Sequence, residues 1–277
     1  MRQNDLLRQT AVLVSALLAI AGAFVGSGAA GGTPIARAAG GALSSDATAV
    51  APGGPAFSIW TVIYVGLIAY AIWQSLPEQK TDERHRRLGW PVSASLLLNA
   101  AWILSVQFDA LPLSVPIIVL LLVVLIRAFF YTIALRPKNV VDAIITDATI
   151  GLYLGWVCIA TAANITAYLV ASGFRGAGLG EAPWGVIVIA AAGLVGILLA
   201  IRGRGRFSPS LALSWGLVWV AVARLWGELR NVPTAIAAVA AIIAILAVTI
   251  IMRSRAARPS RRGPRPRVAP LASADSQ

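Results

Sequence analysis

Eight long apolar segments govern what this chain of 277 residues can fold into. They run roughly over residues 10–30, 56–76, 88–107, 112–134, 141–170, 183–201, 209–227 and 232–252. Most of them reach the ~20 residues that a helix needs to cross a bilayer. Only 12% of the residues are charged, against about 25% in a soluble domain. The segments therefore predict an all-α integral membrane protein with about eight transmembrane helices.

Basic residues concentrate on one side of the predicted membrane. With a cytoplasmic N-terminus, that side holds Arg2, Arg8, Lys80, Arg84, Arg86, Arg87, Arg136, Lys138, Arg202, Arg204, Arg206 and the tail arginines. The opposite loops hold Arg37, Arg175 and Arg230, with Arg224 near that face. The positive-inside rule therefore predicts that both termini are cytoplasmic. Because the chain is rich in Ala and prefers Arg to Lys, we expect a bacterial plasma membrane.

The formal net charge of +12 would suggest nucleic-acid binding in a soluble protein. Here the short loops and the tail carry that charge, and we predict no soluble domain that could read a nucleic acid. The expected partner is therefore the lipid bilayer. The basic tail over 253–277 is predicted to be disordered, since it cannot form a core. Cys158 is the only cysteine, so no internal disulfide can form, and we expect a small buried hydrophobe there.

Two segments near the N-terminus each have two interpretations. Residues 1–30 have a basic start, an apolar middle and a small-residue end, as a cleaved signal peptide does. We favour a retained first helix, because the apolar run exceeds the usual 7–15 residues of a signal core. The loop over 31–55, rich in Gly, Ala, Pro and Ser, is either a flexible linker or a lid over the outer end of the bundle.

An aromatic face marks the second apolar segment. Phe57, Trp60, Tyr64 and Leu67 fall at i, i+3, i+7 and i+10, so they share one face of a helix. Such a face either lies in the aromatic belt at the membrane interface or forms one wall of a pocket for a flat apolar ligand.

The third and fifth segments favour the pocket. Asn99 and Trp102 lie at i, i+3, and Tyr153, Trp156 and Asn164 follow one stripe of the fifth segment. A buried amide is costly without a partner, so each Asn bonds between helices or faces a cavity. Trp73, Trp90, Trp184 and Trp226 lie near span ends and fit an aromatic belt.

Charges inside the membrane are costly and need partners. Arg127 and Asp147 lie ten residues before and ten residues after Pro137, so a hairpin turning there brings them to similar depth. We therefore predict an ion pair between them, with a snorkelling Arg127 as the alternative. Arg224 and Glu228 are expected to pair at i, i+4.

The remaining residues predict no catalytic or metal site. The single histidine, His85, lies in the charged stretch 82–87 and is expected to be solvated. The sequence has no Cys/His cluster for a metal and no plausible Ser/His/acid set.

Three motifs in order resemble the TspO/MBR family, the tryptophan-rich sensory proteins related to translocator protein. They are the aromatic segment around Trp60 and Tyr64, the pair Leu98–Asn99 followed by Trp102, and the stripe Tyr153, Trp156, Ala160 and Asn164. The resemblance covers roughly residues 8–170. It divides the chain into a TspO-like five-helix domain (1–172), an additional three-helix region (173–252) and the tail.

The resemblance implies a pocket among the first five helices, closed by the first loop, that binds a tetrapyrrole such as protoporphyrin or haem. The ligand-binding residues would be Trp60, Tyr64, Asn99, Trp102, Tyr153, Trp156 and Asn164. It also implies homodimerisation, and no cofactor is required. We expect a receptor or sensor for a small hydrophobic ligand. A porphyrin-degrading enzyme and a small-solute transporter are the alternatives.

Overall fold

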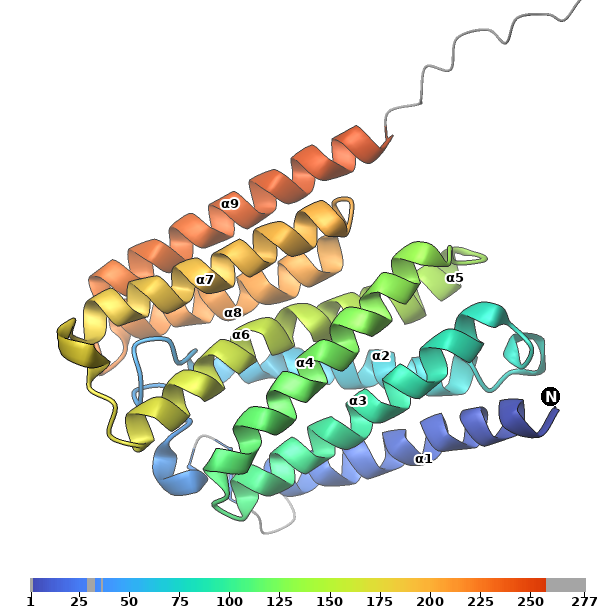
Figure 1. The fold of residues 1–277 in the computed structure, drawn as a ribbon, viewed down its shortest axis with the longest axis horizontal. Coiled ribbons are helices and arrows are strands. Elements are labelled where there is room, and N and C mark those ends of the chain that lie inside the picture. Colours follow the sequence, from blue (N-terminus) through green and yellow to red (C-terminus); the bar gives the residue numbers. More distant parts are fainter. Residues whose placement is uncertain (1, 29–32, 36, 258–277) are drawn as a thin grey trace, which may run out of the picture.

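The chain folds into a bundle of long helices in the computed structural model, which describes residues 2–28, 33–35 and 37–257 (Figure 1). Eight helical segments of this part are long and apolar enough to cross a membrane, and the same part contains no strand. This confirms the predicted all-α membrane fold. The long helices are α1 (Arg2–Gly26), α2 (Ile59–Trp73), α3 (Glu83–Gln107), α4 (Leu111–Ala134), α6 (Thr149–Ala171), α7 (Glu181–Arg202), α8 (Phe207–Trp226) and α9 (Val232–Ala257).

Short helical turns lengthen or join these helices. They are η1 (Ala39–Gly41), η2 (Gly54–Ser58), η3 (Pro77–Gln79), α5 (Val140–Asp142), η4 (Ala143–Ala148) and η5 (Gly176–Gly178). The turn η2 leads directly into α2, and α5 and η4 lead into α6. The turn η4 is π-helical. Such a wider turn often marks a functional site.

The helices form two groups that meet at α6 (Figure 1). In the first group, α3 packs between α1 and α4, and α4 packs against α6. In the second group, α9 packs against both α7 and α8. The contact between α6 and α8 joins the two groups, and the predicted domain boundary near residue 172 falls between α6 and α7.

Glycines allow α6 and α8 to approach closely. A Cβ atom at Gly155 would lie 2.8 Å from the carbonyl carbon of Pro209 and 3.0 Å from the Cβ of Ala212. On the opposite helix, a Cβ atom at Gly216 would lie 2.5 Å from Cγ2 of Ile159. Small residues favour contact between membrane helices because they bring the backbones together.

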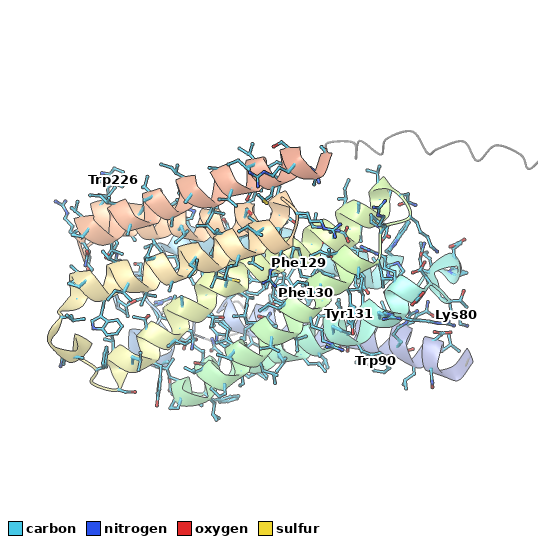
Figure 2. The ribbon with its side chains drawn as sticks, turned by 45° about the horizontal axis from the view of Figure 1, so that its top comes forward. Lys80, Trp90, Phe129, Phe130, Tyr131 and Trp226 are labelled. Atoms are coloured by element: carbon cyan, nitrogen blue, oxygen red, sulfur yellow. The ribbon has the colours of Figure 1, made fainter. Side chains whose placement is uncertain are left out.

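The bundle has two distinct ends, which Figure 2 marks with Lys80 and Trp90 at one and Trp226 at the other. We call the first the basic end; it carries the connections over 74–82, 135–139 and 203–206. The second is the loop end, where the long loop before α2 lies. Trp90 and Trp226 are 49% and 73% exposed, as expected for rings in an aromatic belt.

The long loop packs against the loop end. Ala49, Val50 and Ala51 are buried, and the backbone N–H of Gly53 donates to the carbonyl of Trp219 at 3.1 Å. A flexible linker would not bury these residues, so the packing favours the lid interpretation for this stretch.

Arg224 of α8 forms hydrogen bonds that hold the long loop in place. Its side chain is 1% exposed and donates to the carbonyl oxygens of Ser45 and Thr48, the second at 2.9 Å. The predicted pair with Glu228 is therefore wrong. Spacing along the helix suggested that pair, but the inward face of α8 turns Arg224 toward loop carbonyls that are distant in sequence.

The first five residues of the predicted tail are part of a helix. The helix α9 continues to Ala257, so residues 253–257 are helical. The rest of the predicted tail lies outside the described residues. At the other end of the chain, α1 is an integral part of the bundle, where Ser15 shares a hydrogen bond of 2.6 Å with Ser93 of α3.

Candidate functional site

An aromatic cavity lies at the loop end, among α1, α2 and α3. Its volume is about 340 Å³. It is lined by Ala23, Gly26, Ser27, Pro34, Ile35, Gly54, Phe57, Trp60, Tyr64, Trp102 and Ile103. The side chains of Phe57, Trp60 and Tyr64 come from successive turns of η2 and α2, as the sequence pattern predicted. Pro34 and Ile35 of the long loop also line the cavity, so the loop forms part of its wall.

A second layer of rings supports this wall from α6. The ring of Trp60 lies 5.7 Å from that of Tyr153 and 6.4 Å from that of Trp156, measured between centroids. Phe57 meets Trp156 edge to face at 5.6 Å. Such geometries are favourable for aromatic pairs. Tyr153 and Trp156 are almost fully buried and do not line the cavity, so they position the rings in front of them.

The two asparagines also act behind the cavity. Nδ2 of Asn99 donates to the hydroxyl of Tyr64 at 2.7 Å. Nε1 of Trp102 donates to Oδ1 of Asn164 at 2.9 Å, and Nδ2 of Asn164 donates to Ser114 at 2.8 Å. Both amides are buried and neither lines the cavity. The structure thus brings all seven predicted residues together, three on the wall and four behind it.

This arrangement offers stacking surfaces and one directed donor. The lining is mainly apolar, as ligand pockets are, and the indole of Trp102 and the phenol of Tyr64 are held in place by the asparagines. Because Tyr64 accepts its bond from Asn99, its own O–H can donate to a guest. Among the described residues, no group of three or more His, Cys, Asp and Glu could hold a metal ion.

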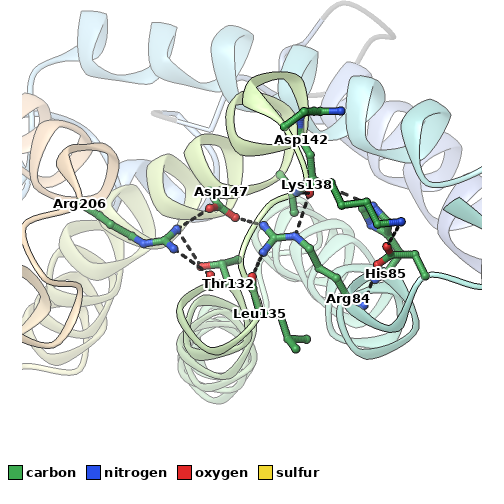
Figure 3. Close-up of polar contacts among 11 residues, drawn as sticks. Arg84, His85, Thr132, Leu135, Lys138, Asp142, Asp147 and Arg206 are labelled. Atoms are coloured by element: carbon green, nitrogen blue, oxygen red, sulfur yellow. Dashed lines mark hydrogen bonds and ion pairs between the residues drawn. The ribbon is translucent and has the colours of Figure 1, made fainter. Parts of the chain in front are cut away.

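The basic end carries a buried cluster of charges, shown in Figure 3. Arg84 of α3 forms ion pairs with Asp142, at 3.3 Å, and with Asp147. Arg206, which precedes α8, pairs with the other oxygen of Asp147 at 2.7 Å and donates to the carbonyl of Thr132 at 2.8 Å. Asp142 directly precedes the π-helical turn η4, and Asp147 lies within that turn. The cluster therefore links α3, α4, η4 and the start of α8.

Lys138 extends this cluster to Asp82, with which it forms an ion pair. Burial acts to raise the pKa of Asp82, but the hydrogen bonds from Lys138 and from the backbone of His85 outweigh it, so the pKa lies below the usual value. Asp82 also caps α3, because its carboxylate accepts from the backbone N–H of Arg84 at 2.8 Å.

The predicted ion pair between Arg127 and Asp147 is wrong. Asp147 does form ion pairs, but with Arg84 and Arg206. Arg127 is exposed, and its guanidinium lies 5.3 Å from the ring centroid of Tyr131. The spacing about Pro137 predicted that both residues lie at similar depth, but not which face of its helix each one occupies. Arg127 points away from the side of α4 that packs in the bundle.

His85 is also placed differently from the prediction. It is 1% exposed, and its Nε2 lies 3.8 Å from Oδ1 of Asp142. The reason is that α3 begins at Glu83, five residues earlier than expected, so His85 belongs to a packed helix. The N-cap pattern of Asp82 followed by Glu83 is the sequence feature that could have revealed this start.

Comparison of the chain with curated proteins and with solved structures finds no match in either set. A protein-family model does match. It describes a TSPO-like protein and covers residues 12–252. The match continues through α7, α8 and α9, beyond the stretch 8–170 to which the recognised motifs are confined. Since it includes most of the chain and reaches into all eight spanning segments, this multi-pass membrane protein belongs to the TSPO-like family.

Proposed function

We propose that this protein is a membrane receptor of the sensor type, whose aromatic cavity binds a flat apolar ligand. The leading ligand class is a tetrapyrrole such as protoporphyrin or haem. The observation that carries the proposal is the set of rings on the wall, from Phe57, Trp60, Tyr64 and Trp102. Family membership supports the same class of function.

The physical basis of binding is stacking and burial. A planar ring stacked against the indoles removes apolar surface from water and gains aromatic contact. The cavity of about 340 Å³ is near the lower end of the usual range for ligand sites. A macrocycle would therefore enter edge first, with its polar substituents left at the opening, where the hydroxyl of Tyr64 can orient one of them.

The proposal is tested by titrating the purified protein in detergent with protoporphyrin and following the fluorescence of the porphyrin. Trp60→Ala and Trp102→Ala should each weaken binding by about tenfold or more, as buried Trp anchors do. Trp90→Ala is the matched control, because Trp90 is exposed at the basic end. Equal affinity in all the variants would mean that the porphyrin partitions into micelles and would reject this site.

We also propose that the basic end faces the cytoplasm of a bacterial cell and that the membrane is the plasma membrane. The asymmetry of Arg and Lys supports this orientation. In a Cys158→Ser background, the variants Lys80→Cys and Asp46→Cys would each place one thiol on one of the two sides of the membrane. A membrane-impermeant maleimide applied to whole cells should label the cysteine at 46 alone, and labelling at 80 would reverse the orientation.

A further inference from the structure

A second cavity, larger than the aromatic cavity, lies apart from it. It has a volume of about 710 Å³ and lies between α6 and α7, with α4 and the long loop contributing to its walls. None of the seven predicted ligand-binding residues lines it. We call it the lateral groove, because Leu169, Ile187 and Val195 of its lining are 39%, 46% and 40% exposed on the membrane side of the bundle.

The lateral groove follows one leaflet of the bilayer. Its lining on α7 extends from Trp184 to Val195, and on α6 from Val170 to Cys158. At 1.5 Å per residue these stretches are roughly 17 Å long, about half of the ~30 Å hydrocarbon core. Both stretches start at the loop end. A chain lying in the groove would therefore reach from the interface to the middle of the membrane.

The deep part of the groove is shaped for a slender apolar chain. Leu122, Cys158, Val188 and Val195 line it, and the small side chains of Ala162, Ala191 and Ala192 leave the space between the helices. The aromatic rings of the lining, Phe174 and Trp184, lie toward the loop end and pack against each other at 5.4 Å. The groove thus differs from the ring-lined aromatic cavity.

Charged residues surround the mouth of the groove. Arg175 supplies a positive charge, and Asp46 and Glu181 supply two negative charges, all three as lining residues. A hydrogen bond from the side chain of Ser44 lowers the pKa of Asp46, so this carboxylate is ionised at neutral pH.

The buried Arg224 fixes the mouth in position. It binds the carbonyls of Ser45 and Thr48, which lie on either side of Asp46 in the loop. A buried guanidinium is costly unless its hydrogen bonds are made. These two bonds hold the stretch of loop that carries Asp46 at the mouth of the groove.

We propose that the lateral groove binds a phospholipid with a zwitterionic, amine-bearing head group from the leaflet at the loop end. One acyl chain lies between α6 and α7. The phosphate pairs with Arg175, and the ammonium group lies near Asp46 and Glu181. With Arg224, whose charge interacts with both carboxylates, the mouth holds two positive and two negative charges. This balance matches a zwitterionic head group better than the net negative charge of an anionic lipid or a free fatty acid.

The test uses the full chain in nanodiscs that contain a photoreactive phosphatidylethanolamine, with crosslinks mapped by mass spectrometry. Crosslinks should concentrate on the peptides over 158–170 and 184–195. Ala162→Phe, which fills the groove, should remove most of them. Leu194→Phe is the matched control, because Leu194 is 57% exposed on α7 and does not line the groove; its crosslinks should equal those of the wild type. Size-exclusion profiles confirm that both variants are folded.

A second arm tests the head group by competition with unlabelled lipids. Phosphatidylethanolamine should compete better than phosphatidylglycerol or palmitate. In the Arg175→Gln variant, unlabelled phosphatidylethanolamine should compete about fivefold less well with the photoreactive lipid, which is the effect of one arginine on a lipid phosphate. Equal competition by phosphatidylglycerol or palmitate would overturn the head-group assignment. Crosslinks that are as frequent on the exposed face of α1, at Leu17 and Leu18, as in the groove would overturn the site itself.

Discussion

The two ends of the first helix group use opposite kinds of side chain. At the loop end, neutral rings surround a cavity, and neutral amides hold two of the rings from behind. At the basic end, Arg84, Asp142, Asp147 and Arg206 form ion pairs that fill the space between helices. The two ends therefore have different roles in the protein. Each buried charge at the basic end depends on its partner, whereas the rings at the loop end surround a space that a ligand can enter.

Energetics predict that the two ends respond differently to substitution. A buried ion pair is rarely worth more than well-packed apolar residues, but removing one partner leaves an uncompensated charge. The basic end therefore tolerates little change, while the loop end tolerates exchange of one neutral contact for another. Substitutions at the two ends should separate these behaviours.

The largest loss of stability should follow from Arg84→Met. This change leaves Asp142 without its arginine and Asp147 with Arg206 alone, in a buried site. The expected cost is about 3–5 kcal/mol, measured as a lower midpoint of thermal unfolding in detergent. Arg87→Met is the control, because Arg87 is 55% exposed in its pair with Glu83. A similar midpoint for both variants would mean that the cluster does not brace the bundle.

A smaller loss is expected at the loop end from Asn164→Leu. The variant removes the acceptor of Trp102 and the donor to Ser114, which should cost about 1 kcal/mol in a membrane bundle. Porphyrin affinity should fall as well, because the indole of Trp102 loses the group that orients it. Both quantities are measured on the same preparation.

Thr166→Ala is the control for this variant. Thr166 lies on the same helix and bonds to Ala162 of its own helix. It should change neither the unfolding midpoint nor the affinity. If Asn164→Leu left the affinity unaltered while it lowered stability, the amide would serve only to join the helices.

Acid should weaken the basic end more than the loop end. The pKa of Asp82 is lowered in the folded protein, so its stabilising effect is complete above the unfolded value of about 3.9 and is lost as the pH falls through the folded pKa. The effect is below about 1 kcal/mol, because Lys138 is 56% exposed and solvent screens the pair.

This pH dependence is measured as the unfolding midpoint between pH 2 and pH 7. Lys138→Gln should reduce the acid-induced fall of the midpoint. Asp109→Asn at the loop end should leave it as in the wild type, since Asp109 is exposed. An identical pH profile for Lys138→Gln and the wild type would remove Asp82 from the acid response.

Sequence patterns predicted the parts of the fold that depend on a single helix. The eight spans follow from their length and hydropathy, and the register of Trp60 and Tyr64 follows from helical periodicity. The contribution of Pro34 and Ile35 to the wall of the aromatic cavity, and the stretch of loop held by Arg224, could not be predicted in this way. They depend on the path of a long loop, which no local pattern specifies.

The basic end shows the same limit in its charges. The depth of Asp147 was predicted, but its partners Arg84 and Arg206 lie 63 and 59 residues away along the chain, on separate elements. Pairs of this kind are set by which helix faces meet. A spacing rule for one hairpin could therefore identify a buried charge that needs a partner without identifying the partner.

The smallest effect should come from Arg127→Gln, which tests that limit directly. Arg127 is exposed and contacts the ring of Tyr131, so its replacement should change the free energy of unfolding by no more than about 0.5 kcal/mol. Asp147→Asn should cost more, because it weakens two ion pairs. A double-mutant cycle then separates the two geometries. The coupling energy between Arg127→Gln and Asp147→Asn should be near zero, whereas the cycle of Arg206→Gln with Asp147→Asn should give a clear coupling. A strong coupling to Arg127 would restore the hairpin pair, and the basic end would then be braced within the α4–α6 hairpin and not across to α8.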